Sequence, residues 1–224
     1  MKINGKYQIN LPADRTEQYL TGWEVERLDS MYKHLVKGDV MYYIGAEQGD
    51  MPALCQIWGC EVAMFEPSDL FWNNIKRIWK MNNLQAPLFF WSGFASNEVS
   101  RLNDVTKWNE INNAIVKKED MGFRELSKEA PNFPQITIDA VSNMIKPPTA
   151  ISIDVEGAEF EVLKGAEKTL KQYKPKIWLS LHPEFLFDQW GMYASEVRNY
   201  IKVLGYKETL LAYEHEVHLY YEAI

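Results

Sequence analysis

The segment Asp39-Val-Met-Tyr-Tyr-Ile-Gly-Ala-Glu-Gln-Gly49 decides the fold class, because an apolar run ends there in two closely spaced glycines. A short apolar run bounded by a turn, as at residues 39–44, predicts a strand that is buried on both faces. Residues 51–58 follow with apolar side chains at helical spacing. A buried strand, a glycine turn and a helix in this order predict one unit of a parallel α/β sheet.

The same alternation of short apolar runs and amphipathic segments continues along most of the chain. Further strands are predicted at 61–65, 88–91, 150–153 and 176–181, and further helices at 70–82, 158–171 and 196–204. Two β-rich runs, at 210–213 and 217–221, predict a terminal hairpin at the sheet edge. The whole pattern predicts an α/β fold in which helices cover both faces of a parallel sheet.

Two regions lie outside this alternation. Residues 1–38 are predicted to form a polar arm and a helix, ahead of a main domain at 39–224. Residues 97–134 interrupt that domain with a polar insertion, and a segment of such length commonly carries its own helix or acts as a lid. We expect both regions to form the wall of a ligand pocket, where Trp23 and Trp108 could stack on a ligand; simple packing is the alternative.

The composition disfavours several classes of function. A net charge of -7 over 224 residues disfavours nucleic acid as a partner, because phosphate binding requires a basic face. The chain shows no signal peptide and no run of 18 apolar residues, so we expect no membrane association. Cys55 and Cys60 lack metal or disulfide spacing, which fits a reduced, cytoplasmic protein. We interpret His215 and His218 as structural, because their spacing in a hairpin points them to opposite faces.

The turn from Gly45 to Gly49 indicates a bound ligand. Small residues let a ligand approach the backbone, and the N-terminus of the following helix offers free N–H groups. Dinucleotides and S-adenosylmethionine both use such a turn, but the dinucleotide pattern has a second glycine where this chain has Glu47. Glu47 and Asp50 would repel a pyrophosphate, which disfavours a nicotinamide-dependent oxidoreductase and favours a ligand with an amino group and a positive sulfonium. A turn without any ligand is the alternative.

Glu66 adds a second element at the same edge of the sheet. It ends the next predicted strand about 20 residues after Gly45, where a carboxylate can accept both ribose hydroxyl protons of an adenosine. Pro67 ends that strand, and Ser68 is placed to cap the following helix. An exposed acid at the end of a strand is the alternative interpretation.

The run Ile151-Ser-Ile-Asp-Val-Glu-Gly-Ala-Glu-Phe-Glu-Val-Leu-Lys-Gly-Ala166 resembles the signature of the FkbM methyltransferase family. Four other segments fall in that family's order: Gly45–Gly49, Phe65–Pro67, Ile136–Asp139 and Leu181–His182. The resemblance extends from about Asp39 to Gly205 and implies a doubly wound, mostly parallel, seven-stranded sheet of the class I methyltransferase (Rossmann-like) kind. It also implies S-adenosylmethionine as methyl donor and a hydroxyl group of a sugar or small natural product as acceptor.

Carried over by position, the resemblance implies roles for several residues. The expected cofactor contacts are Gly45, Ala46, Glu47, Gly49, Glu66, Pro67, Ser68 and Asp154. The chain departs from the family pattern on both sides of Gly45. The family usually has an acid two residues before this glycine and an asparagine two residues after it, whereas this chain has Tyr43 and Glu47. Glu47 could compensate by contacting the cofactor's amino group. The alternative is a catalytically inactive module of the same fold that binds a cofactor or a partner.

Methyl transfer to a hydroxyl group benefits from a base that removes the proton. Asp154, Glu156 and His182 are the expected catalytic residues, because ligands of open α/β sheets bind at the carboxyl ends of the strands. Asp154 is the favoured base, followed by His182; stabilisation of the following helix is the alternative role for the two acids. The three side chains are also possible metal ligands, but no metal-binding spacing is recognisable and no metal is expected.

Overall fold

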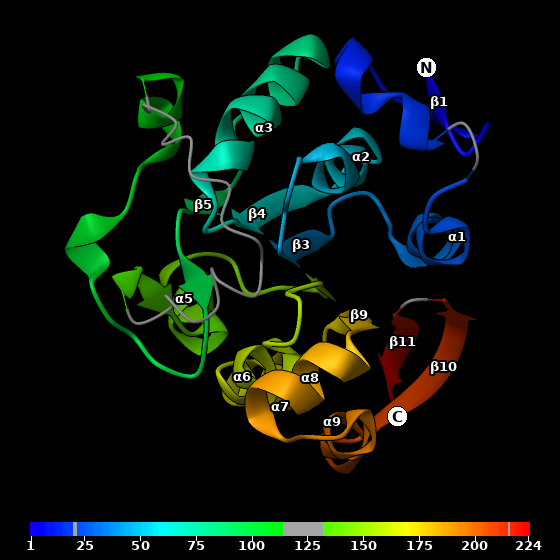
Figure 1. Ribbon diagram of the computed structural model, residues 1–224, viewed down its shortest axis with the longest axis vertical. Helices are drawn as coiled ribbons and strands as arrows, with labels where there is room; N and C mark the ends of the chain where they lie inside the picture. The colour runs from blue at the N-terminus through cyan, green and yellow to red at the C-terminus, as the bar shows by residue number, and fades with distance from the viewer. Residues whose placement is uncertain (20–21, 114–131, 215) are drawn as a thin grey trace.

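The computed structural model describes residues 1–19, 22–113, 132–214 and 216–224. Its centre is a sheet of seven strands (Figure 1). In spatial order these are β10 (Tyr206–Tyr213), β11 (Val217–Ala223), β9 (Lys176–Leu181), β8 (Ala150–Ile153), β3 (Val40–Ile44), β4 (Glu61–Phe65) and β5 (Phe89–Trp91). The last five pair in parallel, while β11 is antiparallel to both of its neighbours. The predicted doubly wound, mostly parallel, seven-stranded sheet is confirmed.

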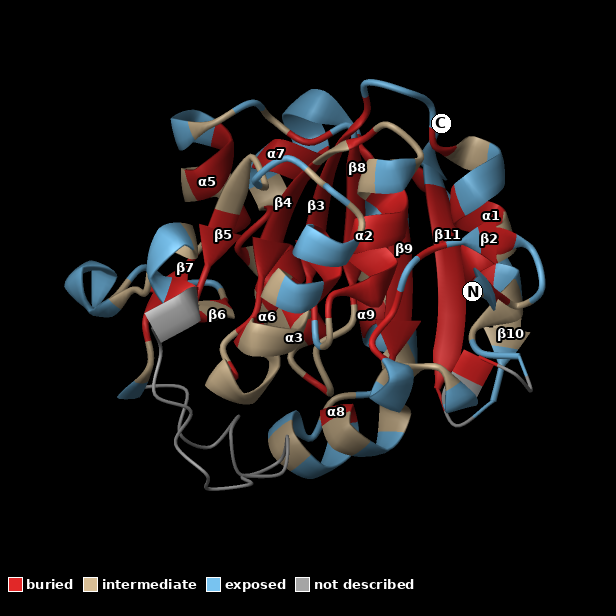
Figure 2. Cartoon of the chain, turned by 90° about the horizontal axis from the view of Figure 1, so that it is seen from above, coloured by how far each residue is buried: buried red, intermediate tan, exposed pale blue. Residues whose placement is uncertain are grey.

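Alternation along the strands divides the core between the two faces of the sheet. In β3, Met41 and Tyr43 pack on one face, whereas Tyr42 and Ile44 pack on the other. The first face is covered by α1 (Val25–His34), α2 (Asp50–Ile57) and α3 (Asp69–Met81). The second is covered by α5 (Ile138–Met144), α6 (Glu159–Lys164), α7 (Glu167–Tyr173) and α9 (Ala194–Val203). The strands are therefore buried along most of their length (Figure 2), except for the edge strand β10.

The single helix predicted at 158–171 is wrong, because the chain forms α6 and α7 with a break at Gly165. The carbonyl of Gly165 accepts a hydrogen bond from the backbone N–H of Asp139 at 2.9 Å. The Asp139 carboxylate in turn accepts the backbone N–H groups of Lys168 and Thr169, at 3.1 and 2.7 Å. A side chain from α5 thus satisfies N–H groups at the start of α7, which ends one helix and begins another.

The C-terminal third otherwise follows the prediction, with one addition. The hairpin of β10 and β11 is confirmed, and β10 forms the edge of the sheet. The additional helix, α8 (Pro183–Trp190), begins with a proline directly after His182, a favourable first helical residue. No helix in the described parts of the chain is both long and apolar enough to cross a bilayer.

The two ends of the predicted insertion at 97–134 lie next to each other in the structure. A short parallel pair joins β6 (Phe94–Ala95) to β7 (Gln135–Ile136). Between them the structure describes two 3-10 helices, η3 (Leu102–Asp104) and η4 (Trp108–Asn113). The rest of the predicted insertion, 114–131, lies outside the described residues, as does His215. The N-terminal region has a small hairpin of β1 (Lys2–Ile3) and β2 (Tyr7–Gln8), followed by η1 (Ala13–Arg15) and η2 (Glu17–Tyr19).

Candidate functional site

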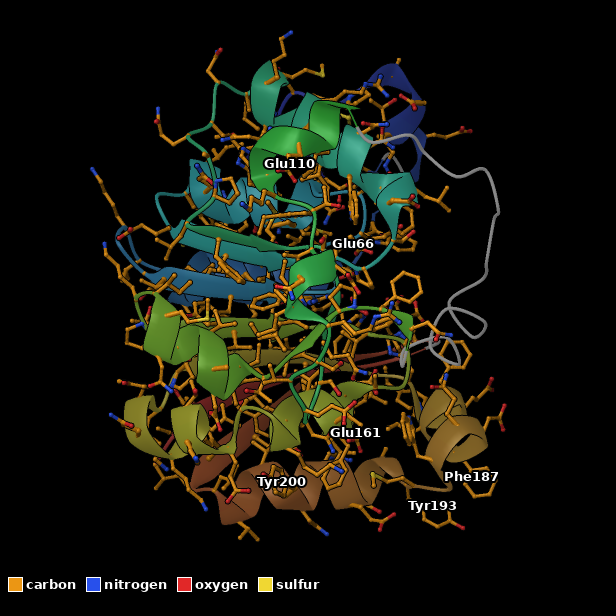
Figure 3. The ribbon with its side chains drawn as sticks, turned by 90° about the vertical axis from the view of Figure 1, so that its left-hand side faces the viewer. Glu66, Glu110, Glu161, Phe187, Tyr193 and Tyr200 are labelled. Carbon is orange, nitrogen blue, oxygen red and sulfur yellow. The ribbon has the colours of Figure 1, made fainter. Side chains whose placement is uncertain are left out.

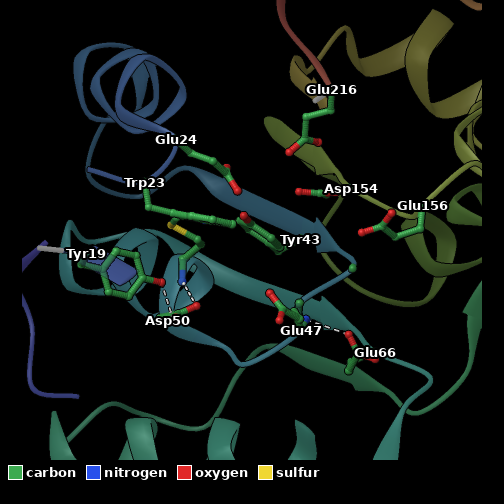
Figure 4. A pocket seen from close by; sticks show the side chains of 13 residues that line it. Tyr19, Trp23, Glu24, Tyr43, Glu47, Asp50, Glu66, Asp154, Glu156 and Glu216 are labelled. Atoms are coloured by element: carbon green, nitrogen blue, oxygen red, sulfur yellow. Dashed lines mark hydrogen bonds between the residues drawn. The ribbon is translucent and has the colours of Figure 1, made fainter. Parts of the chain in front are cut away.

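A cavity of about 270 Å³ lies at the carboxyl ends of β3, β4 and β8. Strands β3 and β8 are neighbours in the sheet although the chain visits β4 and β5 between them, and ligands of open α/β sheets bind at such a reversal of strand order. Among the described residues, the lining includes aromatic side chains and many carboxylates but no lysine or arginine (Figure 4). Its acidic members are Glu24, Glu47, Asp50, Glu66, Asp154, Glu156 and Glu216. Such a lining suits a ligand with positive charge.

The glycine turn forms one wall of this cavity. Gly45 has a φ of 81°, and a Cβ at this position would lie 1.7 Å from the carbonyl oxygen of Asp154. Only glycine tolerates both the left-handed conformation and the close approach of β8. The backbone N–H groups of Gly45 and Ala46 donate to the carbonyl of Phe65, which ties the turn to the end of β4. Gly49 ends the turn as the N-cap residue of α2.

Glu66 is buried where β4 ends, with 3% of its surface exposed. Its Oε2 accepts the backbone N–H of Glu47 at 2.7 Å, and its Oε1 accepts that of Ser68 at 2.8 Å. Burial raises the pKa of Glu66 to about 8, against the lowering effect of these two donors. The carboxylate is therefore fixed in orientation by backbone. The predicted side-chain cap by Ser68 is wrong, since its hydroxyl makes no hydrogen bond to α3.

A second, more apolar cavity of about 60 Å³ adjoins the first. Its own lining includes Pro67 and, from β6, Phe94 and Ala95. Four residues line both cavities, namely Gly45, Glu66, Asp154 and Glu156. Most of the predicted site residues thus line one of two adjoining cavities, the first polar and the second more apolar; Gly49, Ser68 and His182 line neither.

Tyr43, where the family usually has an acid, lies beneath the first cavity and is 3% exposed. Two carboxylates that line the same cavity lie close to this position in space, Glu47 from the glycine turn and Glu24 from the N-cap of α1 (Figure 4). Burial raises the pKa of each to about 7. Both have left-handed backbones, with φ of 44°. Backbone strain of this kind clusters at functional sites, and Glu156 shares it with a φ of 52°.

Arg27 is a site residue that sequence reasoning missed. Its side chain is 2% exposed and donates to Glu24 Oε2 at 2.6 Å, to Asp154 Oδ2 at 2.7 Å and to the Ser152 hydroxyl at 2.7 Å. It therefore anchors the N-terminal helix to β8. Helical periodicity could have revealed Arg27, because it lies one turn before Met31 and therefore on the buried face of the helix. A charged side chain on that face needs a partner.

His182 is surrounded by acids after the end of β9. Its Nδ1 pairs with Glu159 Oε1 at 2.7 Å, and its Nε2 lies 3.1 Å from Glu216 Oε2. The same Nε2 lies 3.5 Å from Glu156 Oε2 and 3.7 Å from Asp154 Oδ1. Burial alone would lower the pKa of His182, but the hydrogen bonds with Glu159 and Glu216 raise it to about 11. Glu216, in the turn between β10 and β11, is a second residue that the sequence pattern missed.

The aromatic residues divide between the cavity and the surface. Trp23 lines the first cavity and is 38% exposed, as expected for a residue at its mouth. Trp108 packs elsewhere, with its ring 5.9 Å from that of Trp79 and the Lys76 ammonium 4.0 Å above it. Phe187 and Tyr193 pack against each other with tilted rings at the outer edge of the molecule, far from Glu66 (Figure 3).

Comparison with solved structures confirms the fold. An FkbM methyltransferase from Methylobacillus flagellatus KT superposes with a TM-score of 0.59 at 19% identity, over 84% of this chain and 44% of its own length. A precorrin-6y C5,15-methyltransferase from Geobacter metallireducens GS-15 superposes with a TM-score of 0.54 at 11% identity, over 96% of this chain and 94% of its own. A methyltransferase from Streptococcus mutans in complex with SAH gives 0.51 at 9% identity, over 88% and 95%. This chain thus spans less than half of the Methylobacillus protein.

No curated protein matches the chain. Residues 39–208, by contrast, match the methyltransferase FkbM domain, a stretch that runs from β3 into β10. S-adenosylmethionine is the cofactor of such a methyltransferase, and the donor set fits it: a buried acid at the end of β4, a glycine turn, and a lining in which carboxylates outnumber the two arginines, Arg15 and Arg27, that pair with them from outside the lining. The chain therefore belongs to the FkbM family of methyltransferases.

Proposed function

We propose that the protein methylates a hydroxyl oxygen of a sugar or another small natural product. The observation that carries this proposal is that two cavities adjoin and are lined in common by Gly45 and Glu66 from the cofactor side and by Asp154 and Glu156 from the segment after β8. A cofactor held by the first pair and an acceptor held by the second would lie next to each other. Bringing the reacting groups together in this way supplies much of the rate of a methyl transfer.

The residues of the glycine turn and of β4 are suited to hold the cofactor. Glu66 presents a carboxylate that backbone N–H groups have already oriented, which suits hydrogen bonds from ribose hydroxyls. Glu47 and Glu24 are the acids available for the amino group, in place of the acid that is missing at Tyr43. When bound, S-adenosylmethionine supplies a methyl group that its positive sulfonium has activated. The acidic lining would stabilise that positive charge.

Glu156 is the base that the contacts favour. Asp154 already accepts a charge-assisted hydrogen bond from Arg27, and both nitrogens of His182 already have carboxylate partners. Glu156 is less engaged, with His182 at 3.5 Å and 30% of its side chain exposed. We therefore assign proton removal at the acceptor hydroxyl to Glu156 Oε2 or its companion oxygen, and orientation of the acceptor to Asp154. This reverses the order of preference that the sequence suggested.

The test is transfer of a labelled methyl group from S-adenosylmethionine to a panel of monosaccharides and glycosides. A sugar O-methyl ether is expected, which survives mild base. Glu156→Gln should lower the transfer rate by about 10²–10⁴, the contribution of a general base. Glu161→Gln, a matched change on the outer side of α6, should leave the rate unchanged. A methylated nitrogen or carbon as the product would contradict the proposed reaction, and an unchanged rate in Glu156→Gln would contradict the assignment of the base.

A further inference from the structure

We propose that His182, Asp154 and Glu216 bind a divalent metal ion of the Mn²⁺ kind, next to the acceptor end of the cavity. One atom of each residue, an imidazole nitrogen or a carboxylate oxygen, lies within 4.8 Å of the others. The three residues come from different parts of the chain, since Asp154 follows β8, His182 follows β9 and Glu216 precedes β11. The ends of three adjacent strands thus converge on one point.

Each of the two acids turns one oxygen toward this common point, while its other oxygen lies near a second basic side chain, Arg27 or His218. Asp154 gives Oδ2 to Arg27 at 2.7 Å and turns Oδ1 toward His182 Nε2. Glu216 lies with Oε1 3.5 Å from His218 and turns Oε2 toward the same Nε2. One oxygen of each acid is therefore directed at His182, while the other lies near Arg27 or His218. A fourth donor, Glu156 Oε2, lies 3.5 Å from the same nitrogen.

The imidazole is oriented as metal-binding histidines are. Its Nδ1 pairs at 2.7 Å with Glu159, a fully buried acid that also accepts the backbone N–H of Gly157. Histidine ligands almost always donate their other ring N–H to a carboxylate or carbonyl, which fixes the tautomer that leaves Nε2 for the metal. Glu159 supplies that partner, and it lies on the opposite side of the ring from the three carboxylates. One acid would suffice for a plain ion pair, whereas four surround this ring.

The spacing of the donor atoms suits one ion. Ligand atoms about 2.1 Å from a metal lie about 3.0 Å apart along the edge of an octahedron and about 3.4 Å apart along that of a tetrahedron. The oxygens of Glu216, Glu156 and Asp154 lie 3.1, 3.5 and 3.7 Å from His182 Nε2. Small rotations of Asp154 and Glu216 would bring their oxygens and the imidazole nitrogen around an ion, with Glu156 Oε2 beside it. The ion would displace the proton that Nε2 shares with Glu216, and the same negative charge that holds that proton would attract a dication more strongly.

The ligand set indicates the type of metal. Carboxylate oxygens with a single imidazole and no thiolate suit hard or borderline ions, and Mn²⁺ accepts both donor types. In the proposed reaction, an ion here would bind the oxygen of an acceptor hydroxyl beside Glu156 and lower the cost of removing its proton. Only this catalytic role depends on the proposed function; the binding of the ion does not.

The experiment is Mn²⁺ titration of the protein without cofactor or acceptor, followed by electron paramagnetic resonance. We expect one Mn²⁺ per chain, a raised melting temperature, and nitrogen modulation of the electron spin echo from a directly bound imidazole. His182→Gln should remove the modulation. Glu159→Gln should weaken binding about 10–100-fold, as loss of a supporting partner does. The matched changes His34→Gln and Glu161→Gln, outside the cluster, should alter neither result.

Absence of Mn²⁺ binding up to millimolar concentration would overturn the proposal, and so would binding without nitrogen modulation. Either result would mean that His182 keeps its proton and that the acids form an internal ion-pair network. The spectrum of the parent protein decides the matter even if His182→Gln does not fold. Because the titration contains no methyl donor, its failure would leave the proposed methyl transfer untouched.

Discussion

The two proposed halves of the site are held in place differently: the cofactor half contains Gly45–Gly49 and Glu66, and the acceptor half contains Asp154, Glu156 and Glu216, with His182 beside them. In the cofactor half, backbone groups hold the side chain: Glu66 accepts N–H groups only 2 and 19 residues away in sequence. In the acceptor half, side chains hold side chains across long separations, such as the 127 residues between Arg27 and Asp154. The first arrangement is built into one βαβ unit, whereas the second requires the whole sheet and the N-terminal helix.

This difference predicts where the two halves are vulnerable. Backbone donors remain when a side chain changes, so the cofactor half should lose affinity rather than stability. The acceptor half places several buried charges around Arg27 and His182, so removal of one charge leaves its partners unsatisfied. The largest effects on folding should therefore come from the acceptor half.

The change Arg27→Met tests this expectation most severely. It leaves Glu24 and Asp154 without their shared cation in a buried setting, and breaking a buried ion pair costs about 3–5 kcal/mol. Urea denaturation should report that loss in the free energy of unfolding. Lys6→Met removes the exposed ion pair with Asp29 instead and should change stability by at most about 1 kcal/mol. Similar losses for the two variants would show that Arg27 does not anchor α1 to β8.

The next largest loss of stability is expected where the glycine turn of the cofactor half contacts Asp154 of the acceptor half. Gly45→Ala adds a Cβ 1.7 Å from the Asp154 carbonyl oxygen, at a φ of 81°. The left-handed backbone costs about 1–2 kcal/mol and overpacking about 1–3 kcal/mol more. Gly38 has a φ of 93°, but a Cβ added there would meet open space. Gly38→Ala should therefore lose only the stability that the left-handed backbone costs. Equal destabilisation of the two variants would contradict the close contact between the glycine turn and β8.

Much of the fold and about half of the site could be predicted from the sequence. The strands, the glycine turn and Glu66 were predictable because their signals are local: apolar runs, glycines and a fixed spacing. The break at Gly165 was not, because it depends on Asp139 reaching in from α5. Arg27 and Glu216 were missed for the same reason, since a charged residue reveals its role only when its distant partners are known.

A smaller effect is expected in the pH dependence of cofactor affinity, which tests whether Glu47 or another acid binds the amino group. Burial raises the pKa of Glu47 to about 7, so its negative form increases as pH rises from 6 to 8. If Glu47 holds the amino group of the cofactor, affinity for S-adenosylhomocysteine should increase about fivefold over that range, since a charged hydrogen-bond partner is worth about 1 kcal/mol more than a neutral one. Glu47→Gln should remove this increase. A parent protein with a flat pH profile, or a variant with the same slope as the parent, would assign the amino group to another acid.

The central claim, that one edge of the sheet is divided into a cofactor half and an acceptor half, is tested most directly by calorimetric titration of S-adenosylhomocysteine into Glu66→Ala and Glu156→Gln. Glu66→Ala removes two hydrogen bonds to the ribose hydroxyls, worth about 0.5–1.5 kcal/mol each, part of which water restores, so affinity should fall about tenfold. Glu156→Gln should bind as the parent does. Parent-like affinity in Glu66→Ala, or an equal loss in both variants, would contradict the division.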